Sequence, residues 1–275
     1  MRVIAHISDL HFGRVDQKIV ASLGAQITAS KPDLIAVSGD LTQRARVPEF
    51  RAARAFLDSF PQPKVIVPGN HDVPLFHLFD RALRPLTKYR EYISADLQPY
   101  YSDEEIAVLG INTARSLVHK AGRINRRQVE NACARFKELS PDVVRIVVTH
   151  HPLDLPDHHP PSHLVGRAQM AMAGFAGCRV DLFLSGHLHV GHTLGTTPRY
   201  AIPGYSAVVV HAGTAASTRT RSEPNSWNLI RIENRRITVE RLTWLSEDGG
   251  FAGPTIERFV STAEGWKQID RPEEP

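Results

Sequence analysis

The chain has 275 residues, of which 42% are hydrophobic and 23% are charged, proportions that are ordinary for a globular protein. Its 33 basic and 29 acidic residues leave a formal net charge of +4, which suits an anionic substrate, but no basic run exceeds a pair, so a polybasic tail is excluded. Because no apolar stretch approaches the ~20 residues of a membrane helix, and polar residues stand too near the start for a signal-peptide core, we expect a soluble cytoplasmic protein.

Apolar runs and helical periodicities alternate at the start of the chain. Short apolar runs predict strands at residues 3–7, 34–37 and 65–67. Apolar residues at helical spacing predict helices at residues 17–29 and 48–60. This alternation indicates an α/β protein with a largely parallel central sheet.

The segment 73–101 departs from this alternation. It carries six aromatic residues and three prolines, and we predict short helices that leave the sheet and return at a strand of residues 106–111. Such an excursion directly after a polar motif could be a cap that shapes a substrate site. It could equally be a structural connection packed against the sheet edge, and the sequence leaves both interpretations open.

The second half of the chain changes from mixed to β-rich. We predict helices at residues 125–139 and 169–176, strands at residues 145–149 and 182–185, and a proline-rich loop at 151–163. Further strands are predicted at residues 207–211, 226–232 and 237–244, with a hairpin turn at 234–236. The residues after Gly249 are weakly patterned, and no repeat or linker divides the chain, so we predict a single domain over residues 1–275.

Two cysteines, Cys133 and Cys178, stand without a Cys-x-x-Cys partner. We predict two reduced, buried thiols. The spacing of the pair does not reveal their distance, so it does not decide against a disulfide.

Polar residues follow five of the predicted strands. The groups are Asp9-Leu10-His11, Gly39-Asp40, Gly69-Asn70-His71-Asp72, His150-His151-Pro152 and Gly186-His187-Leu188-His189. Strand ends that carry such side chains are where open α/β proteins build active sites, so we expect the five groups to converge. Carboxylate, imidazole and carboxamide groups suit two hard or borderline metal ions and not a thiolate-bound structural zinc.

The order Asp-x-His, Gly-Asp, Gly-Asn-His-Asp, His-x-Pro and Gly-His-x-His resembles the calcineurin-like metallophosphoesterase superfamily over residues 9–189. The chain length, the His-His-Pro form and Ala212-Gly213-Thr214 are similar to its bacterial class III cyclic-nucleotide phosphodiesterase and glycerophosphodiesterase branch. The resemblance implies a four-layer α/β/β/α sandwich of two mixed sheets, in which we expect the β-rich C-terminal third to form the second sheet.

The resemblance also implies a site for two divalent or trivalent metal ions, which these ligands would accept as Mn, Fe, Zn or Co. It assigns one ion to Asp9, His11 and His189 and the other to Asn70, His150 and His187, with Asp40 as the bridge. Two ions about 3.5–4 Å apart need an anion between them, which a bridging carboxylate supplies. A bridging water would lose its proton near neutral pH and attack phosphorus in line with the leaving oxygen.

His71 follows a ligand but is not used as one in the family. By resemblance it lies beside the scissile phosphate, where it would protonate the leaving alkoxide as a general acid or stabilise the transition state. Asp72 would brace the turn or orient His71. Because neighbours on a strand face opposite sides, we expect only one of His150 and His151 to bind metal. The resemblance selects His150 through the His-x-Pro form of the family motif, and His151 would then lie behind the ligands or face the substrate.

Three arginines follow the first two motifs and could grip a phosphate by a bidentate contact. They are Arg14, Arg44 and Arg46, and Arg14 is the first choice.

The function predicted from these features is that of a dinuclear metal-dependent phosphodiesterase, acting on a cyclic nucleotide or another small phosphodiester through metal-bound hydroxide. A nucleotide-sugar pyrophosphatase, a phosphomonoesterase and a nuclease are alternatives on the same site. The lack of a basic stripe with interleaved aromatics disfavours nucleic acid, and the sequence Gly39-Asp40-Leu41-Thr42-Gln43-Arg44 lacks the Gly-Asp-x-x-Asp-Arg-Gly form of phosphoprotein phosphatases. A non-catalytic scaffold is disfavoured because all seven ligand types are present. The sequence allows a homodimer without specifying one.

Overall fold

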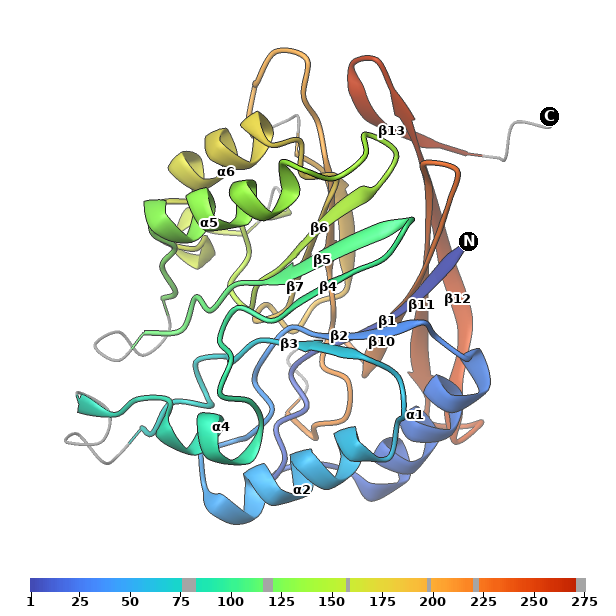
Figure 1. Cartoon of the computed structure of the whole chain (residues 1–275). Helices are drawn as coiled ribbons and strands as arrows, with labels where there is room; N and C mark the ends of the chain where they lie inside the picture. Colours follow the sequence, from blue (N-terminus) through green and yellow to red (C-terminus); the bar gives the residue numbers. More distant parts are fainter. Residues whose placement is uncertain (76–82, 116–120, 157–158, 197–198, 220–222, 271–275) are drawn as a thin grey trace.

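The computed structural model describes residues 1–75, 83–115, 121–156, 159–196, 199–219 and 223–270 (Figure 1). Its helices are α1 (Gln17–Ser30), α2 (Val47–Asp58), α4 (Thr87–Tyr92), α5 (Arg126–Phe136), α6 (Ala168–Gly177) and the short 3-10 helix η1 (Pro161–His163). The strands of the N-terminal half are β1 (Arg2–Ile7), β2 (Leu34–Val37), β3 (Lys64–Ile66), β4 (Tyr100–Ser102) and β5 (Ile106–Gly110). The remaining strands are β6 (Val144–Val148), β7 (Leu182–Ser185), β8 (His192–Gly195), β9 (Val208–His211), β10 (Ser226–Glu233), β11 (Arg236–Leu245), β12 (Gly250–Thr262) and β13 (Gly265–Ile269).

The strands form two mixed sheets. The first has the order β13-β12-β11-β10-β1-β2-β3, with β1, β2 and β3 parallel and β10 to β13 an antiparallel meander. The second has the order β4-β5-β6-β7-β9-β8, in which β5, β6, β7 and β9 are parallel and the edge strands β4 and β8 are antiparallel. Parallel neighbours need a crossover, which the helices α1, α2, α5 and α6 supply for the pairs β1-β2, β2-β3, β5-β6 and β6-β7.

Three apolar clusters separate four layers. The cluster between the sheets takes alternate side chains from both, including Ile4, Val65, Ile146, Leu184 and Ile230. A second cluster joins α1 and α2 to the outer face of the first sheet, and a third joins α5 and α6 to the outer face of the second. Figure 1 shows the helices on the two outer sides of the paired sheets. The predicted α/β/β/α sandwich is therefore confirmed.

The prediction that the β-rich C-terminal third forms the second sheet is wrong. β10 pairs with β1, so the strands from β10 onward extend the first sheet, and only β8 and β9 join the second. The weakly patterned region after Gly249 forms the 13-residue strand β12 and its partner β13. It was missed because β12 buries only Phe251 and Phe259 and its other residues are largely exposed or half-buried, which leaves little apolar signal.

The excursion at 73–101 is partly an anchored connection. In α4, Tyr89 is fully buried in the cluster that contains Leu86 and Ile93, and its hydroxyl donates to the Ile66 carbonyl at 2.9 Å. Residues 76–82, which include the aromatic residues Phe76 and Phe79, lie outside the described residues. The cap interpretation remains a prediction for this segment.

The prediction of two reduced, buried thiols is wrong in the structure. Cys133 on α5 and Cys178 just after α6 form a disulfide with a Cα–Cα distance of 5.3 Å, and both residues are only half-buried. The two helices lie side by side on the second sheet, which brings together residues 45 positions apart. This proximity depends on tertiary packing, which the spacing of the two cysteines does not encode.

The longest described helix, α1, has 14 residues. Among the described residues we find no helix with the length and apolar character that a membrane crossing requires.

Candidate metal centre

The carboxyl ends of five strands, β1, β2, β3, β6 and β7, bring the predicted motifs together at one edge of the sandwich. The first three strands are parallel in one sheet and the last two are parallel in the other. Donor atoms from these strand ends lie within 4.8 Å of one another in overlapping groups. The carboxylates and imidazoles in these groups are those of Asp9, His11, Asp40, His71, His150, His151, His187 and His189.

One group of donors consists of Asp9, His11 and His189. The Nε2 atoms of His11 and His189 lie 3.5 and 3.4 Å from the same carboxylate oxygen, Asp9 Oδ1. All three side chains are buried. His189 is oriented from behind by Thr214, whose hydroxyl lies 2.7 Å from its Nδ1. Such a contact fixes the ring of a metal-binding histidine and leaves its other nitrogen directed at the ion.

The other group consists of Asn70, His150 and His187. Asn70 Oδ1 lies 3.1 Å from His150 Nε2 and 3.0 Å from His187 Nδ1. The second nitrogen of His150, Nδ1, donates to the Ser38 carbonyl at 2.8 Å, because a carbonyl oxygen can only accept. With Nδ1 held by this bond, Nε2 is the nitrogen that faces Asn70 and Asp40.

Asp40 lies between the two groups. Its Oδ2 is 3.8 Å from His11 Nε2, and its Oδ1 is 3.4 Å from His150 Nε2. The backbone N–H of His71 donates to Oδ1 at 2.8 Å, which fixes the carboxylate. The two donor groups therefore share one carboxylate, as a dinuclear centre requires.

Several buried atoms of these groups have no hydrogen-bond partner in the described part of the chain. They are Asp9 Oδ1 and both ring nitrogens of His11. Leaving buried polar groups unpaired costs about 1–3 kcal/mol each, so such a concentration in one place indicates a missing ligand. A divalent cation fits the donor set, because oxygen and imidazole donors converge on the same space.

The backbone at this edge adopts conformations that L-residues rarely use. Asp9, His11, Asp40, His187 and His189 all have positive φ, between 50° and 73°. Such conformations cost on the order of 1 kcal/mol or more each and cluster at functional sites. Here the left-handed residues after β1, β2 and β7 direct polar side chains toward the shared space.

Gly39 also has a positive φ, 91°, and lies under the donor groups. A Cβ atom there would lie 2.7 Å from His150 Nδ1 and 2.9 Å from the Gly69 backbone nitrogen. Only glycine allows the β2 and β3 loops to approach the histidine this closely.

The charges of the centre favour ionised carboxylates. Burial raises the pKa of Asp9, but the neighbouring His189 and His11 outweigh it and hold that pKa well below its usual range. For Asp40, burial is likewise outweighed, chiefly by His150, so its pKa is lowered. Burial, with His150, lowers the pKa of His187 to about 3, which keeps this imidazole neutral. Anionic carboxylates and neutral imidazoles are the forms that bind metal ions.

His71 lies at the rim of the centre, and the structure identifies a contact that sequence reasoning missed. Its Nδ1 donates to the Gln43 carbonyl at 2.8 Å, and its Nε2 lies 3.0 Å from Nη1 of Arg219. A guanidinium can only donate, so Nε2 carries the lone pair and the ring is neutral. Burial lowers the pKa of His71, and the Asp40 carboxylate opposes this only in part.

Arg219 is brought to the centre by the loop after β9, where the hydroxyl of Ser217 accepts from the Arg219 backbone N–H at 3.0 Å. That loop is held by the carbonyl of Arg14, which accepts from the Thr218 N–H and the Ser217 hydroxyl. No motif marks Arg219 in the sequence, because its position depends on a contact between residues more than 200 positions apart. The only local signal is its place a few residues after Ala212-Gly213-Thr214.

Asp72 braces the turn and does not contact His71 through its side chain in the described structure. Its carboxylate accepts from the backbone N–H groups of Leu41, Thr42 and Gly69 and from the Thr42 hydroxyl, at 2.9–3.2 Å. Burial and the nearby Asp40 raise the pKa of Asp72 to about 6. Of the two roles that the sequence left open, the structure supports bracing of the β2 and β3 loops.

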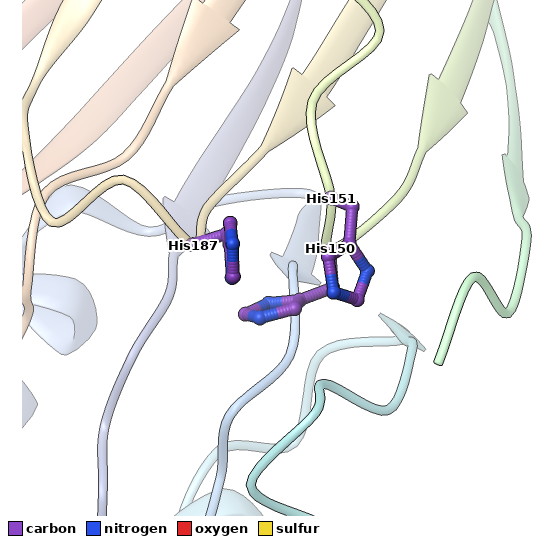
Figure 2. Close-up of side chains that lie close together, drawn as sticks. All are labelled: His150, His151 and His187. Atoms are coloured by element: carbon purple, nitrogen blue, oxygen red, sulfur yellow. The ribbon is translucent and has the colours of Figure 1, made fainter. Parts of the chain in front are cut away.

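Strand alternation does not separate His150 from His151, because β6 ends at Val148 and both histidines lie in the following loop. Figure 2 shows both rings beside His187, with ring centroids 5.1 Å and 4.6 Å from it. The rings still differ in their contacts. His150 faces Asn70 and Asp40, whereas Nδ1 of His151 lies 2.9 Å from the Thr113 hydroxyl.

The arginines chosen from the sequence are not in the centre. The Arg14, Arg44 and Arg46 side chains are exposed. Arg14 contributes its backbone carbonyl instead, and Arg219 is the arginine whose side chain contacts His71 at the rim of the centre. Arg14 as a substrate contact stays a prediction without support from this geometry.

Solved structures of known proteins share the fold of this chain. Solved structures with the same fold include a dimetal phosphatase from Danio rerio, with a TM-score of 0.66 at 13% identity over 87% of this chain and 95% of that one. A purple acid phosphatase from yellow lupin (Lupinus luteus) seeds has a TM-score of 0.67 at 11% identity, over 93% of this chain and 53% of the other. At these identities the similarity concerns the fold alone.

The sequence defines the family. The model of the calcineurin-like phosphoesterases matches residues 2–191, and the chain belongs to this family. A probable cyclic nucleotide phosphodiesterase of Synechococcus sp. is 22% identical over 89% of this chain and 93% of its own length. A glycerophosphodiester phosphodiesterase of Enterobacter lignolyticus is 34% identical over 95 residues, which are 30% of this chain and only 34% of that relative.

Proposed function

We propose that the protein is a dinuclear metal-dependent phosphodiesterase that hydrolyses a small phosphodiester. The observation that carries the proposal is the sharing of one buried carboxylate, Asp40, by two groups of three donors. The family to which the chain belongs supports a phosphoric ester as the substrate. A non-catalytic scaffold would need neither buried donors without partners nor left-handed backbone at five of them.

Under this proposal each donor group holds one metal ion. The first ion would bind Asp9, His11 and His189, the second would bind Asn70, His150 and His187, and Asp40 would bridge them. Bound ions would lower the pKa of a water molecule toward neutrality and offset the charge that develops on the phosphoryl oxygens. Mn, Fe, Zn and Co all remain candidates for this donor set.

His71 and Arg219 would act on the substrate side of the centre. Nε2 of His71 carries a lone pair and receives a proton only when Arg219 moves away from it. A bound phosphodiester anion attracts the guanidinium and also favours the protonated imidazole. His71 would then hold a proton at Nε2 and pass it to the leaving alkoxide.

The substrate is proposed to be a cyclic nucleotide or another small phosphodiester. The similarity to a probable cyclic nucleotide phosphodiesterase and to a glycerophosphodiester phosphodiesterase supports this substrate class. A nucleotide-sugar pyrophosphatase, a phosphomonoesterase and a nuclease would use the same metal ions, so the proposal is tested against them.

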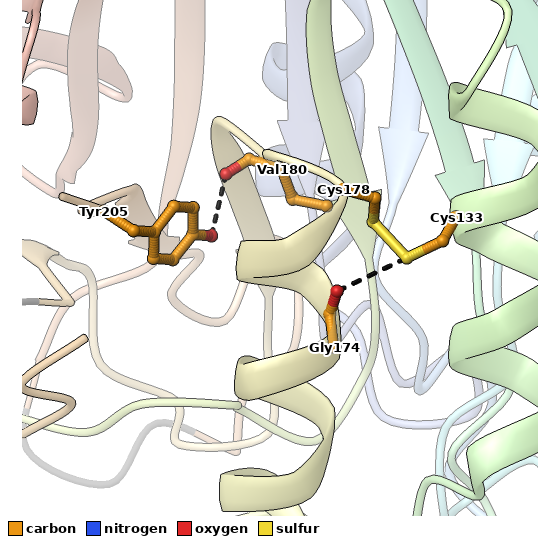
Figure 3. The surroundings of a disulfide bond; sticks show 5 residues. All are labelled: Cys133, Gly174, Cys178, Val180 and Tyr205. Carbon is orange, nitrogen blue, oxygen red and sulfur yellow. Dashed lines mark hydrogen bonds between the residues drawn. A yellow bond between two sulfur atoms is a disulfide. The ribbon is translucent and has the colours of Figure 1, made fainter. Parts of the chain in front are cut away.

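A cytoplasmic location and a homodimer stay predictions. The Cys133–Cys178 disulfide (Figure 3) weakens the prediction of a cytoplasmic location, because disulfides are rare in cytosolic proteins. Free thiols can be titrated in protein that was expressed in hosts with a reducing or an oxidising cytoplasm. The comparison would show in which of these environments the two cysteines are oxidised.

The test combines elemental analysis with a substrate panel. We expect two metal equivalents per chain and hydrolysis of an aryl phosphodiester and of cyclic nucleotides, with slower release of phosphate from phosphomonoesters. The panel contains phosphomonoesters, phosphodiesters, cyclic nucleotides and pyrophosphates, each assayed with Mn, Fe, Zn and Co. Absence of bound metal together with absence of turnover on every substrate would overturn the proposal.

A further inference from the structure

A basic groove lies beside the candidate metal centre. Its volume is about 740 Å³, which is the size of a pocket for a small organic ligand. The described residues that line it include the four arginines Arg84, Arg90, Arg115 and Arg123 and contain no aspartate or glutamate. The rest of the lining is apolar, with Val73 and Leu97 among it, or consists of uncharged polar side chains.

The four arginines have no counter-ions in the described structure. None of their guanidinium groups takes part in a hydrogen bond or an ion pair with a described residue, although other arginines of the chain do, such as Arg199 with Asp154. Arg115 and Arg123 are also half-buried. Burial and then the charge of Arg123 lower the pKa of Arg115, so the two cations repel each other without an acid to relieve it.

The amide side chains of the groove, in contrast, are already paired. Asn125 Oδ1 accepts from the Gln128 N–H at 2.9 Å, and Gln128 Nε2 donates to the Asn112 carbonyl at 2.7 Å. These bonds build the wall of the groove at the start of α5. Among the described lining residues, the charged donors that face a ligand are the guanidinium groups.

The groove adjoins the centre through two chain segments. Val73 is two residues from His71, a span of at most ~7 Å. On the other side, Ala114 is next to Thr113, whose hydroxyl lies 2.9 Å from His151, and Arg123 follows Gly122, which packs against the same ring. A molecule whose phosphodiester lies on the metal ions can thus extend into the groove.

We propose that this groove binds a second phosphate group of the substrate, so that the protein acts on small, nucleoside-sized phosphodiesters that carry an additional phosphate. The proposal rests on the proposed function, because it places the reacting phosphodiester at the metal centre. The apolar lining would contact the body of the substrate, and the arginines would bind the additional phosphate by bidentate contacts. A small substrate is favoured over a polymer because the groove has the volume of a single small ligand.

The experiment compares two substrates that differ only in one phosphate. They are the 5′-(p-nitrophenyl phosphate) of thymidine and the same compound with a 3′-phosphate. We expect the additional phosphate to lower KM by about tenfold or more, because hydrogen bonds to charged groups contribute that much. Two double variants test the groove: Arg84→Ala/Arg90→Ala, which changes two exposed positions, and Arg115→Ala/Arg123→Ala. In both variants the preference for the additional phosphate should fall to less than threefold. The kcat/KM for bis(p-nitrophenyl) phosphate, which lacks this phosphate, should stay the same.

The matched control is Arg126→Ala/Arg127→Ala. It removes the same charge from exposed positions in the first turn of α5 that do not line the groove. This variant should keep the preference, and thermal melting should show that all three variants are folded. Equal KM values for the two substrates in the wild-type protein would overturn the proposal and leave the phosphodiesterase function intact.

Binding separates the two proposals if nothing is hydrolysed. Calorimetry measures the affinity of the protein for thymidine 3′,5′-bisphosphate and for thymidine 5′-monophosphate, and it requires no turnover. Tighter binding of the bisphosphate that disappears in the Arg84→Ala/Arg90→Ala variant would support the groove even if the phosphodiesterase function failed. Equal binding of the two nucleotides, or binding of a single-stranded oligonucleotide far more tightly than of the bisphosphate, would contradict it.

Discussion

Strand β7 has a buried polar site at each end, and the two sites differ in how their polar atoms are paired. Before the strand, Asp181 accepts from Arg235 at 2.8 Å, from Trp266 Nε1 at 2.9 Å and from the Arg145 backbone N–H at 2.9 Å. After the strand, His187 enters the metal centre, where buried atoms of neighbouring donors lack partners. The first site is completed by the protein and ties the two sheets together, whereas the second is completed only by a ligand.

A structural carboxylate and a functional one can be told apart by comparing these two sites. Both kinds are buried and both have basic neighbours, so burial alone does not distinguish them. The distinction lies in the pairing of their oxygens, because a buried polar group without a partner is tolerated where function requires it. Substitutions at the two ends should therefore affect different measurements.

The largest effect is expected for Asp40→Ala. Loss of the shared carboxylate should remove at least one metal ion and lower kcat by about 10³-fold or more, since metal ions contribute several kcal/mol to the transition state. Metal content by elemental analysis and steady-state kinetics measure both. Asp40→Asn keeps the shape and separates the loss of charge from the loss of the side chain. Retention of two tightly bound ions in Asp40→Ala would refute the assignment.

His71→Ala should lower kcat by about 10²–10⁴-fold, the contribution of a general acid, while both metal ions stay bound. The loss should be greatest for substrates with poor leaving groups, because these depend most on protonation. Aryl phosphodiesters with leaving groups of increasing pKa measure this dependence. An equal loss for every leaving group would exclude His71 as the proton donor and leave it a role in binding.

Asp181→Ala should change stability and leave the chemistry alone. Its removal leaves a buried indole N–H and a buried backbone N–H unpaired, at a cost of about 3 kcal/mol in the free energy of unfolding. Denaturant unfolding of the metal-free protein measures this, with Asp142→Ala, an exposed acid near the same end of the strand, as the control. Loss of bound metal in folded Asp181→Ala would mean that the two ends of β7 are not independent.

The last effect concerns pH and a buried histidine at the end of β9. His211 is fully buried with its Nδ1 2.8 Å from the Ser185 hydroxyl, and burial, with His192, lowers its pKa to about 3. The unfolded chain binds a proton at this histidine below about pH 6.5, whereas the native state does not. Stability should therefore fall on acidification between about pH 6.5 and 3, by up to ~1.4 kcal/mol per pH unit from this group.

The measurement is the free energy of unfolding against pH for the wild-type protein and His211→Gln. The variant should have a shallower slope over this range, since it has lost one titrating group. Parallel curves would show that His211 takes up its proton in the native state as readily as in the unfolded chain.

Sequence reasoning was reliable where a signal is local. Apolar runs in the sequence predict the strands β1, β2, β6 and β7, and the motif residues that follow these strands lie close together. It failed for β12, whose solvated faces carry few apolar residues, and for the pairing of Cys133 with Cys178. Arg219 and the four groove arginines were missed for the same reason, because only the fold brings them to their sites.

The left-handed backbone at Asp9, His11, Asp40, His187 and His189 has an evolutionary consequence. Glycine and asparagine adopt this conformation more readily than most residues, so a mutation from a ligand to either would meet little resistance from the backbone. A lineage released from selection for catalysis could then lose its ligands one by one and keep a folded sandwich. The fold does not by itself retain the ligands at these five positions, and only selection for turnover retains them.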